Sequence, residues 1–206
     1  MKYIFIITIV SLLSFTQIFA QQTGTMKDNR DGKTYKTVKI GNQWWMAENL
    51  AFNTGTGCWT TDNNYYNVDK YGYLYNYQTA TSVCPNGWHL PSDYEWTQLE
   101  EYIISVDATI SKDRNGWTNM GKLLKSKSGW EHNENGTDQF GFNALPAGGH
   151  TSYSSYGGIG CYARWWSNTG AGKGAIKRYL TCYDGALRRG AETCKTDNIS
   201  VRCIKD

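Results

Sequence analysis

Apolar and polar residues alternate from Tyr35 to Ile40, which predicts a β-strand with one buried and one exposed face. The pair Gly41-Asn42 follows and suits a two-residue turn. Residues 43–46 are therefore expected to return as the second strand of a hairpin. The preceding residues, 21–32, are mostly polar and are expected to form a flexible segment.

After residue 92 the apolar residues change to a helical spacing. Trp96, Leu99 and Ile103 fall on one face of the predicted helix, and Glu100 and Glu101 are placed on its outer side. A second helix is expected near residues 117–127, with Met120, Leu123 and Leu124 directed inward.

Ser92 and Glu95 have the S-x-x-E spacing of a capping box at the start of the first helix. We therefore interpret Glu95 as a capping residue rather than as a general acid. His89, between Trp88 and Leu90, is interpreted as a hydrogen-bonded, partly buried histidine rather than a catalytic one. Local spacing shows no serine or cysteine nucleophile beside a base.

The last third of the chain reads as short strands and turns. Phe140 and Phe142 are spaced as on one face of a strand. Three later stretches, ARWWSNTG, KRYLTCYDGALRRG and NISVRCIKD, have strand character, and Asp184-Gly185 marks a hairpin turn. By contrast, residues 148–166 are rich in Gly, Ser and Tyr and are expected to form a long exposed loop.

Residues 1–20 have the features of a secretory signal peptide: Lys2, an apolar run over residues 3–14, and Ala20 before Gln21. We expect cleavage there, export to the periplasm, cell surface or medium, and no membrane span in the mature chain. All six cysteines lie after residue 20. An even number of cysteines in an exported chain is typical of disulfide pairing, and their spacings match no zinc site.

Composition narrows the class of protein further. The chain has 206 residues, including 22 Gly, 15 Tyr and 9 Trp, and a formal net charge of +3. The charges are interspersed, so no nucleic-acid partner is expected. Many aromatic residues and turn formers indicate a β-rich domain with long loops.

Several motifs occur in the order found in one known family: IGNQWWMAENL, YGYLYNYQTATSVCPNGWHLPSDYEW, GTDQFGFNALPAGG, WWSNTG and SVRCIKD. Through them the chain resembles the Fibrobacter succinogenes major paralogous domain, from about residue 27 to 206. That family is regarded as related to the C-type-lectin-like fold, in its formylglycine-generating-enzyme branch. The resemblance implies a loop-rich α+β domain over residues 33–206, with two helices packed on small antiparallel sheets, both termini in one small sheet, and disulfides stapling it.

The resemblance also concerns the cysteines. Tyr77, Ala80 and Cys84 fit the spacing along the first helix of C-type-lectin folds, in which a cysteine near that helix pairs with one on the last strand. Cys84 and Cys203 match those two positions. Cys182 and Cys194 flank the predicted turn and are expected to pair across it, which leaves Cys58 with Cys161 as the weakest assignment among 15 connectivities.

The resemblance also sets expectations about chemistry. The calcium-binding tripeptides of sugar-binding C-type lectins are absent, so no calcium-bridged sugar site, metal or cofactor is expected; Glu134 and Asp138 are the nearest candidates for a weak calcium site. Formylglycine-generating enzymes hold copper with a close pair of cysteines near the C-terminus. Since Cys182 and Cys194 are expected to form a structural disulfide, we expect no enzyme of that type.

The favoured function is a non-catalytic, exported binding module for a glycan or a surface protein. Loops rich in Tyr, Trp, Ser, Gly and Asn provide the chemistry of binding surfaces. A structural or assembly role in the cell envelope is the alternative, in which the tryptophans are core residues. The tyrosines of residues 148–166 are either ligand contacts or a lid on the core. The predicted ligand-binding residues are His150, Tyr153, Tyr156, Tyr162, Arg164, Asn168, Arg188 and Arg189.

Overall fold

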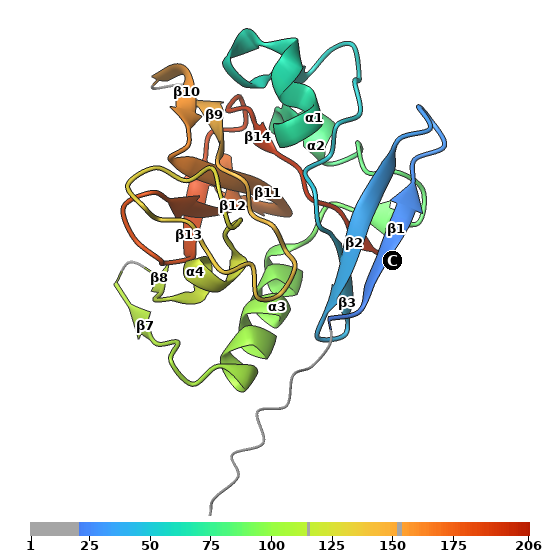
Figure 1. The fold of residues 1–206 in the computed structure, drawn as a ribbon. Helices are drawn as coiled ribbons and strands as arrows, with labels where there is room; N and C mark the ends of the chain where they lie inside the picture. The colour runs from blue at the N-terminus through green and yellow to red at the C-terminus, as the bar shows by residue number, and fades with distance from the viewer. Residues whose placement is uncertain (1–20, 115, 152–153) are drawn as a thin grey trace, which may run out of the picture.

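Two main sheets of different size, antiparallel apart from one parallel strand pair, lie beside helices and two short ribbons in the computed structural model (Figure 1). The structure describes residues 21–114, 116–151 and 154–206. The predicted signal peptide lies outside these residues. Among the helices in the described part, none is long and apolar enough to span a bilayer.

The smaller of these sheets has the strand order β1-β2-β3-β15-β6 and brings the last strand beside the first hairpin. In β3 and β15, Trp45 is opposite Ile204, so the expected joining of the two termini is confirmed. The strands are β1 (Thr23–Lys27), β2 (Thr34–Ile40), β3 (Gln43–Met46), β6 (Trp88–His89) and β15 (Ile204–Lys205).

The first hairpin is confirmed, since Ile40 pairs with Gln43 around the two-residue turn. Gly41 has φ of 60° there, a conformation that glycine adopts without steric cost. The flexible segment expected over residues 21–32 is wrong, because Thr23–Lys27 pairs along β2 in continuous register. The backbone N–H and C=O groups of this polar stretch form hydrogen bonds with the open edge of β2. The composition of the stretch did not indicate this pairing.

The larger sheet has the order β13-β12-β11-β14-β5-β4. Strands β12 and β13 are antiparallel and joined through residues 182–187, so the turn predicted at Asp184-Gly185 is confirmed. The strands are β4 (Cys58–Thr60), β5 (Tyr73–Tyr75), β11 (Tyr162–Ala171), β12 (Gly174–Thr181), β13 (Arg188–Thr193) and β14 (Ile199–Ser200).

Residues 148–166 do not form the long loop that was expected. Most of them belong to a two-stranded ribbon and to the start of β11. Glycine normally weakens a strand, but it also allows two backbones to approach closely. The two strands of the ribbon use this close approach, since a Cβ on Gly148 would lie 2.7 Å from the Gly157 carbonyl oxygen. This ribbon consists of β9 (Ala147–Thr151) and β10 (Ser154–Ile159), and a second one of β7 (Lys112–Asp113) and β8 (Gly116–Trp117).

The main helix, α3 (Asp93–Val106), starts with the predicted capping box: Ser92 accepts from the Glu95 N–H, and Glu95 accepts from the Ser92 N–H. Placing Glu100 outside was wrong, because it is buried and pairs with Arg178. The other helices are η1 (Thr61–Asn63), η2 (Tyr65–Asn67), α1 (Val68–Tyr71), α2 (Tyr77–Ala80) and α4 (Met120–Leu124).

Aromatic residues form much of the core. Trp45, Trp96, Trp165 and Trp166 are all buried, which confirms the core interpretation for these four, whereas Trp44 and Trp88 are only partly buried. Phe140 and Phe142 are also buried but lie in no strand, so that expectation was wrong. They lie in a loop in which Phe142 packs on Trp45 and Trp96, and Phe140 packs on Tyr102.

Candidate functional site

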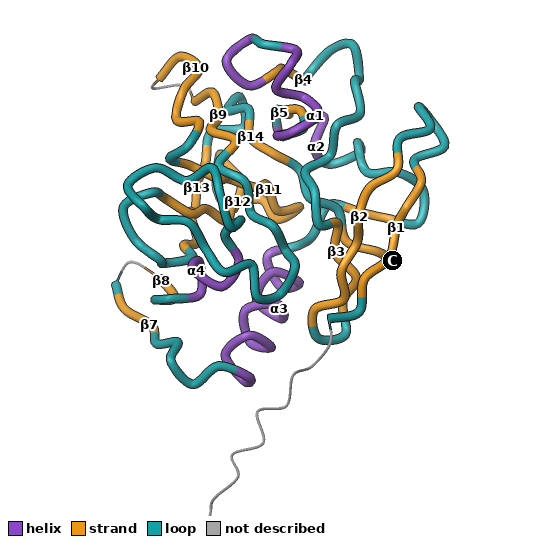
Figure 2. Tube along the Cα trace, viewed as in Figure 1, coloured by secondary structure: helices purple, strands orange, loops and turns teal. Residues whose placement is uncertain are grey.

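A cleft of about 670 Å³ opens where α2 and β4 approach β9 and the segment before β14. Figure 2 shows these elements gathered at one end of the molecule, and β9 contacts both β14 and η1. The cleft is lined by Trp59, Asn76, Tyr77, Gln78, His150, Lys195, Thr196 and Asn198.

Two partly buried aromatic rings belong to the lining. Trp59 is carried by β4, which pairs with β5. Tyr77 begins α2 and packs edge-on against the buried Trp166, with ring centroids 5.4 Å apart. Because Trp166 is fixed in the core, Tyr77 is held in a defined orientation.

The polar side of the cleft is built by a backbone bridge. The N–H of His150 donates to Asn198 O (3.0 Å), and the N–H of Asn198 donates to His150 O (2.7 Å). In the side chains, His150 Nδ1 and Asn198 Nδ2 lie 3.3 Å apart. Asn198 is only 4% exposed, and its Oδ1 has no hydrogen-bond partner in the described structure. Buried polar atoms without a partner are uncommon in native proteins, and a bound water can satisfy them.

Lys195 is tied to the aromatic side of the cleft. Its carbonyl oxygen accepts from the Tyr77 N–H (3.1 Å), and its Nζ lies 5.2 Å from the centroid of the Tyr77 ring. The ammonium therefore lies over an aromatic face, where a cation is attracted by the ring quadrupole. Lys195 itself is exposed, so these contacts leave donor capacity toward solvent.

The predicted ligand-binding residues are distributed over several places. His150 lines the cleft. Tyr162 and Arg164 stack on each other, with the guanidinium 4.0 Å from the ring centroid, and Tyr162 also contacts the exposed Tyr183. Tyr153 lies outside the described residues, and Tyr156 is described only as part of β10.

Arg188, Arg189 and Asn168 are not brought to the cleft lining. Arg188 forms an ion pair with Asp184, and Arg189 forms one with Asp93 at 2.9 Å. Asn168 is exposed, and its N–H donates to Pro91 O. These arginines are thus engaged in ion pairs of the fold, and their place on a ligand rim stays a prediction.

Sequence reasoning missed most of the cleft, including Trp59, Lys195 and Asn198. Trp59 comes from β4, whereas Lys195 and Asn198 come from the stretch before β14, and no local spacing connects the two segments. Tyr77 was noted only for its place before Cys84. The tyrosine and tryptophan residues outside the motifs of the family resemblance were one signal that could have indicated this cleft.

The cysteines correct two predicted disulfides. Cys84 pairs with Cys203, as the resemblance implied, but Cys161 pairs with Cys182. Cys182–Cys194 and Cys58–Cys161 are therefore wrong. Cys161 lies just before β11 and Cys182 just after β12, and the antiparallel pairing of these strands brings the two together.

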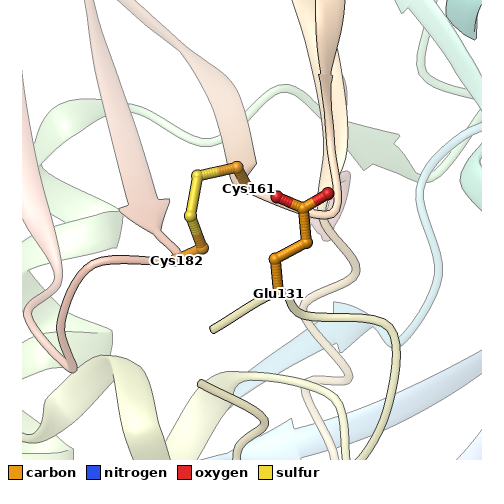
Figure 3. Close-up of side chains that lie close together, drawn as sticks. All are labelled: Glu131, Cys161 and Cys182. Carbon is orange, nitrogen blue, oxygen red and sulfur yellow. A yellow bond between two sulfur atoms is a disulfide. The ribbon is translucent and has the colours of Figure 1, made fainter. Parts of the chain in front are cut away.

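Glu131 lies beside the second disulfide, with its carboxylate directed toward the sulfur atoms (Figure 3). These three residues are spaced closely enough to hold a metal ion. In the disulfide, however, neither sulfur is a thiolate, the form that binds metals. Glu131 is then the one ionisable ligand of this group, which is too few for a metal centre.

Comparison with known proteins identifies the family. Residues 38–205 match the Fibrobacter succinogenes major domain. No curated protein and no solved structure matches the chain. Since the match spans most of the sequence, the chain belongs to the Fibrobacter succinogenes major domain family.

Proposed function

We propose that this protein is a non-catalytic binding module that acts after export, at the bacterial cell surface, and recognises a saccharide in the cleft around His150 and Asn198. The observation that carries the proposal is the cleft lining, which combines two aromatic rings with several amide side chains. Ligand sites typically combine apolar walls with a few placed polar groups.

Each part of this lining suits one part of a sugar. The C–H face of a pyranose ring is apolar and can cover the ring of Trp59, since aromatic residues provide large, rigid contact area. Asn76, Gln78 and Asn198 carry amides that both donate and accept hydrogen bonds. Sugar hydroxyls also donate and accept, so the pairing is complementary.

A binding role is favoured over catalysis by the residue types. Among the described residues that line the cleft, none is Asp, Glu or Cys, so paired carboxylates or a thiol nucleophile are not available there. His150 is the one lining side chain that commonly transfers protons near neutral pH. An oxidase of the formylglycine-generating type gains no support, because Cys182 is joined to Cys161.

A structural role in the envelope is the second candidate, and one observation favours it. Tyr65 and Tyr66 lie together on η2 and are 73% and 93% exposed. Adjacent exposed tyrosines are common in protein interfaces. Neither tyrosine belongs to the described cleft lining, so a protein partner bound there would use different side chains.

A glycan array screen followed by calorimetry separates these functions. Trp59→Ala is expected to weaken saccharide binding at least ten-fold, while the melting temperature changes little. Tyr94→Ala is the matched control, because Tyr94 is an exposed aromatic on α3 and does not line the cleft. Unchanged glycan affinity in Trp59→Ala would refute the assigned site. A protein crosslinked through the Tyr65 region, with no glycan bound, would support the structural role.

A further inference from the structure

We infer that the saccharide is acidic, with a carboxylate or sulfate group that meets the ammonium of Lys195. This inference rests on the proposed saccharide binding and adds the charge of the ligand. It follows from the ionisable groups in and behind the cleft.

Lys195 is the lysine of the lining, and none of the described lining residues is Asp or Glu. Lys195 is held at the aromatic side by its contact with Tyr77, and its ammonium has three donors. A charged acceptor forms a stronger hydrogen bond with an ammonium than a neutral hydroxyl does.

Arg164 on β11 lies behind the lining, and Lys177 is carried by the neighbouring strand β12, with its side chain beside Gly190 of β13. A Cβ built on Gly149 would lie 3.1 Å from Arg164 Nη1 and 3.2 Å from Asn198 O. The guanidinium is therefore next to the backbone that forms the His150–Asn198 bridge. Lys177 lies close enough for the two charges to interact: burial lowers the pKa of Lys177, and the charge of Arg164 lowers it further.

Neither Arg164 nor Lys177 forms an ion pair with a described residue. Burial lowers the pKa of Arg164 as well, which reflects the cost of holding its charge out of water. The buried Asp197 opposes this effect for both cations. Within the cleft, Lys195 has no acidic neighbour among the described lining residues, so a ligand can supply its counter-charge.

The amide of Asn198 explains why a saccharide fits better than a small anion. Its Oδ1 lacks a hydrogen-bond partner and can only accept. A carboxylate or sulfate has no donor for it, whereas a sugar hydroxyl has one. An acidic sugar supplies a negative group for Lys195 and hydroxyl donors for the amide in one molecule.

The experiment compares charged and neutralised forms of the same glycans. The full mature protein is screened against uronic-acid, sialylated and sulfated oligosaccharides, together with their methyl-esterified or desulfated counterparts. We expect the bound glycans to be acidic and neutralisation to weaken binding at least ten-fold. Lys195→Gln should reproduce this loss for the acidic form and leave the neutral form unchanged.

The outcomes are distinguishable. If neutral and acidic forms bind equally, or if Lys195→Gln has no selective effect, the acidic-ligand inference is overturned and the saccharide-binding proposal stands. If no glycan binds, both are overturned. If a DNA oligonucleotide of matched charge competes as well as the acidic glycan, the attraction is general to polyanions and the saccharide assignment is wrong.

Discussion

The Nε2 atom of His89 lies 2.7 Å from Oε1 of Glu95, the residue that caps helix α3. The other ring nitrogen, Nδ1, lies 2.6 Å from Oδ1 of Asp206. A neutral imidazole can donate from only one nitrogen, so donation to both carboxylates requires the charged form. His89 thus links the helix start to the end of the chain, in agreement with its prediction as a hydrogen-bonded histidine.

The His89 contacts predict pH-dependent stability. Burial alone would lower the pKa of His89, but hydrogen bonds to Asp206 and Glu95 outweigh it and raise the pKa above its ordinary value. The stabilisation is therefore complete below about pH 6.5, the unfolded value, and is lost as pH rises through the folded pKa. The pKa of Glu95 is lowered, so its own contribution is lost only in acid.

His89→Gln tests this dependence. Unfolding free energies of wild type and variant, measured at about pH 6 and about pH 9, should differ more at the lower pH. Because the three side chains are partly exposed, we expect the change to be about 0.5–1 kcal/mol. An identical difference at both pH values would contradict a charged His89.

Glu100 is predicted to be essential for stability. It is buried, and its Oε1 lies 2.5 Å from Nε of the fully buried Arg178. Arg178 would keep its ion pair with Asp93 but lose the hydrogen bond from its Nε to the buried Glu100 carboxylate, so Glu100→Gln should cost about 2 kcal/mol in urea unfolding. Glu101→Gln, the exposed neighbour on the same helix, is the control and should cost less than about 0.5 kcal/mol. Equal effects would mean that Glu100 is exposed in solution.

The two disulfides should differ in their effect on stability. Cys84–Cys203 spans 119 residues and Cys161–Cys182 spans 21. In the chain-entropy view, the longer loop restricts the unfolded chain more, so removing the first bridge should cost about 4–5 kcal/mol and the second about 3 kcal/mol. Chemical denaturation of the two double-alanine variants measures this. Peptide mapping that recovers Cys182 linked to Cys194 would contradict the second bridge.

Calcium is predicted to have no effect on folding. Glu134 pairs with the buried Lys125 at 3.0 Å, and Asp138 Oδ1 accepts from the Asn143 N–H at 2.6 Å. Both carboxylates are thus used within the fold, whereas calcium takes six to eight oxygen ligands. Thermal unfolding with millimolar calcium and with chelator should give the same midpoint. A midpoint several degrees higher with calcium would reveal a site.

Gly149 offers a test of the packing behind the cleft. A side chain there would meet Arg164 Nη1 and the Asn198 carbonyl. Gly149→Val is expected to weaken saccharide binding more than Gly170→Val, because only one backbone atom lies near the Cβ position of Gly170, at 4.0 Å. Circular dichroism checks that both variants fold, and calorimetry measures binding. Equal binding by both would show that residue 149 does not shape the cleft.

The local elements were open to prediction because their signals are local. The turn at Gly41-Asn42 and the capping box of Ser92 and Glu95 need only residues within four positions of each other. The burial of Trp96, Leu99 and Ile103 follows from helical spacing alone. In these stretches the predicted turn, cap and apolar positions agree with the structure, and Glu100 is the exception.

The helix start and the first hairpin could therefore be predicted from local patterns, and the fold class and the Cys84–Cys203 bridge from the family resemblance. The contacts of Cys161 with Cys182 and of Glu100 with Arg178, and the shared cleft of Trp59 and Asn198, became known from the three-dimensional structure. Each of these pairs is brought together by the pairing and crossing of separate strands and helices. Sequence spacing carries no information on such contacts, because the chain between the partners can follow many paths.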